Sequence, residues 1–206
     1  MQLLFLLNFA CTTTNPYGYS GFSVYDYLAF DGDRAWTYQS ESEDYTLVVE
    51  KYPSTFIDGI ETATFEYSKE DPYEALGSVT WQSGSTDGIG IESYSLGGEK
   101  IELDEFVVFA KTRMADGDTV ESSANDVNFT GIFNGQENCP NDWGTETDWV
   151  CLYFSLSAEQ EGHGIPFVGD YWMANGWGAS RFKTNEGPWA SDEEWVLIGA
   201  EWENAE

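Results

Sequence analysis

Few residues of this chain have types and spacings that could support catalysis. The sequence contains one histidine, His163, within the glycine-flanked stretch EGHGIP. A serine hydrolase needs a nucleophile on a sharp turn, an imidazole base and an orienting acid, but no G-x-S-x-G turn occurs. His-Glu-x-x-His and phosphate-cradling Gly-Lys motifs are also absent from the sequence. His163 is therefore interpreted as an exposed loop residue.

Carboxylates are abundant, and a glycosidase needs only two of them on facing strands. Glu66, Glu92 and Glu201 fall in stretches that the sequence pattern predicts to be strands. With 37 Asp and Glu residues in the chain, however, the pattern does not single out a pair. These three glutamates are interpreted as solvated residues, and we predict no catalytic residue.

Calcium is the one metal ion that the acidic turns would suit. The triplet DGD occurs at 31–33 and again at 116–118, and NGQENCPND precedes Trp143. These stretches supply the hard oxygen ligands that calcium prefers, but none follows the EF-hand order. Turns of an acidic protein produce such clusters freely, so no metal or cofactor is predicted.

Two cysteines flank a loop rich in turn-forming residues, in CPNDWGTETDWVC. Cys139 and Cys151 are predicted to pair across a hairpin. Closing a loop of this size would contribute about 3 kcal/mol of stability. Disulfides persist in oxidising compartments, so this pair predicts an exported protein.

The first eleven residues, MQLLFLLNFAC, resemble the end of a lipoprotein export signal. An apolar run at 3–7 is followed by a small residue directly before Cys11, although no Lys or Arg precedes the run. We predict a signal at 1–10, a lipidated Cys11 that opens a tether at 11–21, and one β-domain at 22–206. Thr12 follows the cysteine, which is typical of export to the outer membrane. The alternative is that 3–10 forms a first strand and Cys11 is buried.

The charge of the chain argues against polyanionic partners. The formal net charge is −29, so nucleic acids and anionic membrane surfaces would repel the protein at long range. Aromatic residues make up 17% of the sequence, which argues against a disordered acidic chain.

Short alternating apolar runs predict the elements that hold these residues. Among them are YTLVVE, ETATFEYS, WVCLYFSL and WVLIGAEW. Alternation predicts that one face of each strand is buried. The residues that share a face are Ala63, Phe65 and Tyr67 in the second run, Val150, Leu152, Phe154 and Leu156 in the third, and Val196, Ile198, Ala200 and Trp202 in the fourth. Turn dipeptides separate the runs, at 31–32, 58–59, 87–88, 97–98, 116–117 and 134–135. This pattern predicts an all-β fold, an antiparallel barrel, half-barrel or sandwich of about ten strands. At most one or two short helices are expected, one of them at 71–76.

Aromatic residues are the candidates for ligand binding. The stretch DYWMANGWGASRF places Tyr171, Trp172 and Trp177 around two glycines, and Trp143 and Trp189 lie beside other turns. Because they lie beside turns, Trp143, Trp177 and Trp189 are expected to be exposed. Such rings can stack on sugar faces or line a concave sheet that holds an acyl chain. Both interpretations stay open from the sequence.

Three segments together resemble a group of uncharacterised bacterial envelope lipoproteins. They are YDYLAFDGDRAWTYQSES with its Trp-x-Tyr strand, FVVFAKTRMADGDTVES with its Gly-Asp turn, and the closing DYWMANGWGASRF. Their order covers about 25–202, although Trp177 stands where an aliphatic residue is usual. The resemblance implies an antiparallel barrel or half-barrel, distantly similar to lipoprotein carriers, and no catalytic residue.

From these observations we expect an exported lipoprotein, anchored to the outer membrane through Cys11, or extracellular. Its β-domain would bind an apolar ligand or an envelope protein, or serve a structural role. The alternative is a carbohydrate-binding β-sandwich that uses exposed tryptophans and calcium.

Overall fold

The structure, a computed structural model, describes residues 22–23, 27, 33–84, 88–139, 149–159 and 164–202. The predicted signal at 1–10, Cys11 and the tether at 11–21 lie outside the described residues. So do His163, Trp143 and the predicted turn at 31–32.

The described residues form antiparallel strands and contain no α-helix. The strands are β1 (Phe22–Ser23), β2 (Arg34–Gln39), β3 (Leu47–Lys51), β4 (Thr55–Ile57), β5 (Ile60–Lys69), β6 (Glu74–Gly84), β7 (Gly88–Leu96), β8 (Glu99–Ala110), β9 (Arg113–Met114), β10 (Thr119–Ala124), β11 (Val127–Cys139), β12 (Trp149–Ala158), β13 (Gly169–Ala174), β14 (Gly178–Thr184) and β15 (Trp195–Trp202).

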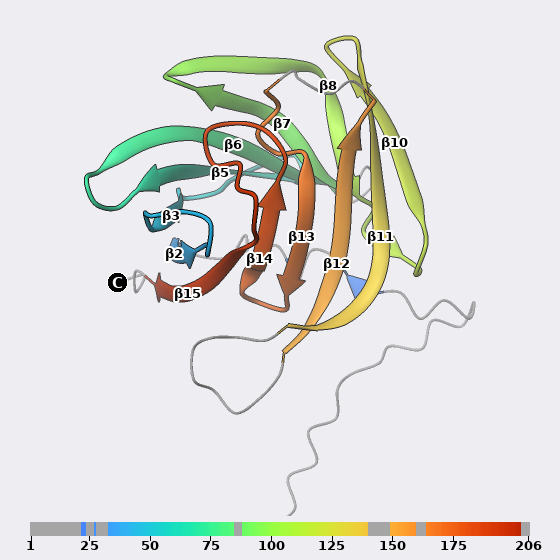
Figure 1. Cartoon of the computed structure of the whole chain (residues 1–206). Helices are drawn as coiled ribbons and strands as arrows, with labels where there is room; N and C mark the ends of the chain where they lie inside the picture. Colours follow the sequence, from blue (N-terminus) through green and yellow to red (C-terminus); the bar gives the residue numbers. More distant parts are fainter. Residues whose placement is uncertain are drawn as a thin grey trace, which may run out of the picture.

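Twelve of these strands form one sheet in the order β10-β11-β12-β13-β14-β15-β2-β3-β5-β6-β7-β8. The strand β4 pairs with β5 outside this path, and β1 pairs with β9. The sheet curls so that its two end strands, β8 and β10, lie side by side (Figure 1). The predicted all-β antiparallel fold is confirmed, in the form of a nearly closed barrel.

Side chains complete the contact between β8 and β10. The backbone N–H of Val108 donates to Ser122 Oγ at 3.1 Å, and the N–H of Asn125 donates to Asp104 Oδ1 at 2.6 Å. The N–H of Asp104 donates in turn to Asn125 Oδ1 at 3.1 Å. Polar side chains thus accept hydrogen bonds from backbone N–H groups at the sheet edge, which would otherwise pair with a neighbouring strand.

The barrel has two ends that differ in chemistry. At one end, called here the Arg34 end, β2 begins, β3 ends at Lys51 and β14 begins. At the other, called the Trp189 end, β14 stops and β15 starts. The loop between β14 and β15 covers the Trp189 end, where Trp189 and Trp195 are fully buried.

Some local predictions are confirmed and others are wrong. The pairs 58–59, 97–98 and 116–117 form turns whose glycines have positive φ. The pair 134–135 is instead a bulge within β11, where the register with β12 shifts. The expected helix at 71–76 is wrong: 70–73 is a turn and β6 begins at Glu74. Pro72 suits this turn because it has no N–H to donate to a ladder.

The predicted orientation of β15 is also wrong. The buried residues are Trp195 and Leu197, whereas Ile198 is 40% exposed. Both faces of this strand carry large apolar residues, so alternation alone does not select the inner one. None of the described residues forms a helix long and apolar enough to cross a membrane.

Candidate functional site

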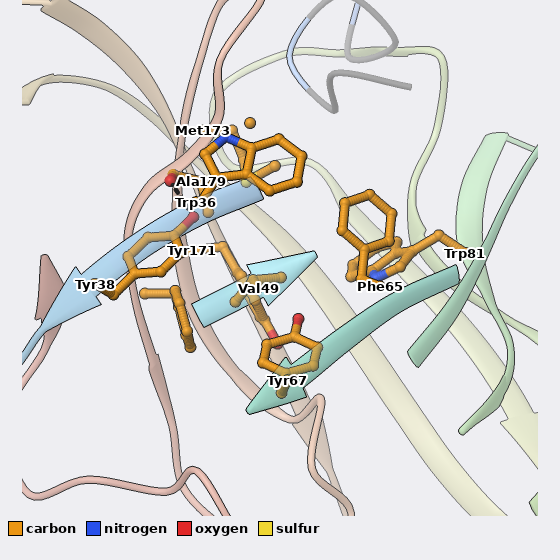
Figure 2. Close-up of a pocket in the computed structure, with 11 residues that line it drawn as sticks. Trp36, Tyr38, Val49, Phe65, Tyr67, Trp81, Tyr171, Met173 and Ala179 are labelled. Atoms are coloured by element: carbon orange, nitrogen blue, oxygen red, sulfur yellow. Dashed lines mark hydrogen bonds between the residues drawn. The ribbon is translucent and has the colours of Figure 1, made fainter. Parts of the chain in front are cut away.

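An aromatic-lined space lies inside the barrel. Figure 2 shows Trp36 and Tyr38 on β2, Val49 on β3, and Phe65 and Tyr67 on β5 around this space. The rest of its lining is Trp81, Tyr171, Met173, Gly178, Ala179 and Phe182. The free volume is about 50 Å³, which is room for one or two water molecules. We call this space the interior cavity.

Strand β2 positions one wall of the interior cavity through hydrogen bonds to β14. The two strands are not neighbours in the sheet, because β15 lies between them, and β14 pairs with β15 only at Arg181 and Phe182. Trp36 Nε1 donates to the Trp177 carbonyl at 2.7 Å, and Tyr38 Oη donates to the Ala179 carbonyl at 2.8 Å. The inward side chains Trp36 and Tyr38 of β2 therefore donate hydrogen bonds to backbone carbonyls at the start of β14.

The tyrosines of the cavity wall stay protonated. Burial raises the pKa of Tyr38, Tyr67 and Tyr171 well above the ordinary value of a phenol. The hydroxyl of Tyr171 donates to the Phe167 carbonyl at 2.8 Å. The cavity wall is therefore electrically neutral and mostly apolar.

Two cations lie at the Arg34 end of the interior cavity. Arg34 and Lys51 face each other in the register between β2 and β3, and their exposures are only 8% and 3%. Alternation along each strand places Arg34 on the same face as Trp36, and Lys51 on the same face as Val49. The charged pair therefore forms the layer next to the aromatic wall.

Backbone carbonyls are among the partners of both cations. The guanidinium of Arg34 donates to the Gly176 carbonyl, and Lys51 Nζ donates to the Tyr52 carbonyl at 3.5 Å. The carbonyl of Gly176 belongs to the turn between β13 and β14. This bond continues the series that ties β2 to β14.

A polar cleft of about 300 Å³ adjoins the same cations. Its lining is Asp33, Arg34, Ala35, Glu50, Lys51, Tyr52, Pro53 and Glu201. Its volume is at the lower bound of small-molecule sites. Arg34 and Lys51 thus lie between an aromatic cavity and an open polar cleft.

The predicted aromatic candidates have different locations. Tyr171 lines the interior cavity, whereas Trp189 is 1% exposed and stacks on Tyr67 with ring centroids 4.1 Å apart. The expectation that Trp189 is exposed is therefore wrong, because its loop turns inward and covers the Trp189 end. Trp172 and Trp177 do not line the cavity and belong to a separate cluster.

That cluster surrounds the cysteine pair. Cys139 and Cys151 are at disulfide distance, as predicted, with Cα atoms 5.6 Å apart. Trp172 and Ala174 are buried with them, and Trp177 packs against them. The carbonyl of Trp177 contributes to the β2–β14 contact, and its ring packs beside the cysteine pair.

Trp172 is held between two side chains of adjacent strands. The ring of Tyr153 stacks on it with centroids 4.6 Å apart, and the Arg181 guanidinium lies 4.2 Å from its ring centroid. Trp172 Nε1 donates to Glu137 at 2.8 Å, and Arg181 pairs with both Glu137 and Glu194. These contacts fix the ring in the wall, so we assign it a packing role.

The three glutamates considered for a glycosidase are not brought together. Glu66 accepts bonds from the exposed Tyr52 and Tyr73, at 3.0 and 3.3 Å. Strands β2 and β3 lie between Glu66 on β5 and Glu201 on β15. Three strand spacings amount to roughly 14 Å, beyond the carboxylate separation of glycosidases. Glu92 lies farther along the sheet, on β7.

Metal ligation finds no support in the part of the chain that the structure describes. No group of three or more His, Cys, Asp or Glu side chains among these residues could hold a metal ion. The acidic triplet at 116–118 forms a turn in which Asp118 accepts a bond from the Ala115 N–H at 2.7 Å.

The sequence reasoning missed the residues at the Arg34 end. Arg34 precedes Trp36 by two positions in RAWTYQ, and Lys51 follows Val49 by two in LVVEK. Residues two positions apart in a strand share a face, so each cation lies on the same face as a buried apolar residue. The sequence alone already indicates this placement. Comparison with family models, curated proteins and solved structures finds no match to this chain.

Proposed function

We propose that this protein is an exported, lipid-anchored binding protein whose barrel takes an apolar ligand into the interior cavity. The observation that carries the proposal is the aromatic wall inside the barrel, which includes Trp36, Phe65 and Trp81. Enclosed apolar surfaces with a few polar groups are typical of small-molecule sites. The disulfide-distance pair supports an oxidising compartment.

A ligand larger than water must displace side chains, since the free volume of the cavity is about 50 Å³. Met173 is the lining residue best suited to move, because its unbranched thioether chain has three rotatable bonds. The Trp189 end offers less freedom, since Trp189 and Trp195 are interlocked there by a hydrogen bond. Entry is therefore proposed from the Arg34 end.

The tryptophans named for the carbohydrate alternative do not form an exposed platform among the described residues. Trp189 and Trp172 are buried, and Trp177 packs beside the cysteines. Stacking on a sugar face needs exposed rings. The interior cavity is therefore the better-supported site.

Narrowing the interior cavity should weaken the binding of an apolar probe. Ala179 lines the cavity and is half-buried, so Ala179→Leu adds three carbons beside the space. We expect the dissociation constant for octanol to rise about tenfold, because displaced methylenes lose their burial. Isothermal titration calorimetry measures the change.

The matched control for this variant is Ala75→Leu, at an exposed position of β6. It should leave octanol binding unchanged. Equal affinities for the wild type and Ala179→Leu would place the probe outside the cavity, and the absence of any octanol binding to the wild type would refute the proposed function.

Anchoring through Cys11 is a separate part of the proposal. When the protein is produced with native export, the intact mass should include acyl groups, because the apolar run before Cys11 fits a lipoprotein signal. Cys11→Ala should abolish the added mass and shift the protein from the membrane fraction to the soluble one. An unmodified wild-type mass with unchanged partitioning of Cys11→Ala would contradict lipid anchoring.

A further inference from the structure

We infer that the outer face of the barrel binds a methylated ammonium group at Tyr52, Tyr73, Glu50 and Glu66. We call these residues the outer site. The outer site is separate from the interior cavity, so the inference goes beyond the proposed function. Its basis is a pair of exposed tyrosines whose hydroxyls donate to one carboxylate, that of Glu66.

The two tyrosines reach Glu66 from opposite ends of the barrel. Tyr52 directly follows β3 at the Arg34 end, whereas Tyr73 directly precedes β6, which begins at the Trp189 end. Their hydroxyls donate to different oxygens of Glu66, at 3.0 and 3.3 Å. The backbone N–H of Tyr52 also donates to the Thr64 carbonyl, at 2.9 Å. The rings are 46% and 69% exposed, so two anchored aromatic rings adjoin one carboxylate at the surface.

A second carboxylate lies beside that of Glu66. Glu50 on β3 is directly opposite Glu66 on β5 in the register. The neighbours of Glu66, Phe65 and Tyr67, line the interior cavity, so alternation directs Glu66 outward. Glu50 is exposed and lies on the same outer face. Like charges directly opposite each other destabilise a sheet, and a cation bound beside both would lower this repulsion.

The charges of both glutamates act on both rings. The pKa of the Tyr52 phenol is raised chiefly by its hydrogen bond to Glu66, and the pKa of the Tyr73 phenol chiefly by the charge of Glu66. The charge of Glu50 adds to the increase in both pKa values. The rings therefore stay neutral phenols next to two negative charges.

The basic side chains of the protein form no ion pair with these two carboxylates. All 8 Lys and Arg residues lie within the described ranges, and no ion pair between described residues includes Glu50 or Glu66. Lys69, three positions after Glu66, pairs with Glu74 at 3.2 Å, and Lys51 lies on the inner face. The charge of the outer site is therefore complementary to a cation from outside the chain.

An organic ammonium group fits the outer site better than a metal ion does. Calcium takes about six to eight oxygen ligands, whereas no group of three or more acidic side chains among the described residues could hold a metal ion. A methylated ammonium group instead binds to the faces of aromatic rings, and nearby carboxylates add attraction to its charge. The net charge of −29 also raises the local concentration of cations.

The test compares choline, its neutral analogue 3,3-dimethylbutanol and the neutral sugar cellobiose as probes of the wild type, by titration calorimetry at low ionic strength. We expect choline to bind at least about tenfold more tightly than the neutral analogue, because the two molecules share a shape and only choline carries a charge. Cellobiose should bind more weakly than choline. Saturating octanol should leave choline affinity unchanged, since the interior cavity is a separate site.

Substitutions locate the bound cation. Tyr73→Ala removes a ring face and Glu66→Gln removes a charge, so each should weaken choline binding about three- to fivefold. Tyr73→Phe keeps the ring and should stay within about twofold of the wild type. Glu99→Gln, at an exposed position of β8, loses the same charge as Glu66→Gln and should leave choline affinity unchanged. Tyr73 is itself exposed, so these changes at its side chain spare the core.

The outcomes separate this inference from the proposed function. Equal affinities for choline and the neutral analogue, or tighter binding of cellobiose, would show that the outer site does not select a cation. An equal loss of choline affinity in Glu66→Gln and Glu99→Gln would mean that only the overall charge attracts choline. Each of these results, like the absence of choline binding, overturns the inference. None of them affects octanol binding, which tests the interior cavity.

Discussion

Replacing Trp189 with alanine is expected to lower the free energy of unfolding by about 3–5 kcal/mol. The ring is 1% exposed and stacks on Tyr67 in nearly parallel planes. Its removal leaves a cavity at the Trp189 end of the barrel, where neighbouring rings are fixed by their own contacts. Urea denaturation followed by circular dichroism measures the loss.

The backbone around Trp189 is fixed by hydrogen bonds that the substitution retains. Its carbonyl accepts from Trp195 Nε1 at 2.9 Å and from Thr184 Oγ1 at 3.4 Å. The loop therefore cannot easily collapse into the space that the ring leaves. Phe56→Ala, at a ring that is 73% exposed, is the control and should cost less than about 0.5 kcal/mol. Similar losses of unfolding free energy for the two variants would mean that the Trp189 ring does not stabilise this end of the barrel.

Removing the cysteine pair is expected to cost about 3 kcal/mol. Cys139 and Cys151 lie 12 positions apart in the sequence and at disulfide distance, and a bond between them restricts the unfolded chain. The double substitution Cys139→Ala with Cys151→Ala removes this restriction. Both side chains are fully buried, and Ser180 Oγ lies 3.0 and 3.1 Å from the two sulfurs, so some packing is lost as well.

Reductant provides the control for this prediction. Urea denaturation of the wild type should shift to lower urea when dithiothreitol is present, whereas the double variant should not respond to it. A wild type that is insensitive to reductant, or free thiols at both cysteines of the exported protein, would contradict the disulfide.

Much of the fold could be predicted from local alternation. In β5, the residues Ala63, Phe65 and Tyr67 were expected on one face, and all three pack in the core. In β12, Leu152, Phe154 and Leu156 are buried as the alternation predicts, whereas Val150, on the same predicted face, is 49% exposed and Cys151, on the other face, is buried. Period-two patterns succeed in these strands because one face is clearly more apolar than the other.

The failures have physical causes. In β15 both faces are apolar, so the inner one follows from the pairing with β2 and β14 and not from the strand itself. Trp189 lies in a loop, and its burial depends on a path that covers one end of the barrel. Long-range packing of this kind leaves no periodic signal in the sequence.

The candidate site depends on long-range contacts as well. Trp36 and Trp177 are joined by a hydrogen bond across 141 positions of sequence. No spacing rule links such positions. Alternation predicts that Arg34 and Lys51 each lie on the buried face of a strand. It does not predict that the two strands pair in a register that brings both cations to one end.

The central claim is that an apolar ligand enters the interior cavity, and the methyl group of Met173 reports on it most directly. The chain has 3 methionines, so ¹³C-methyl methionine labelling gives a simple spectrum in which Met173→Leu assigns the cavity signal. Titration with octanol should shift the Met173 resonance in proportion to the bound ligand. Octanol binding detected by calorimetry with an unchanged Met173 resonance would contradict the account.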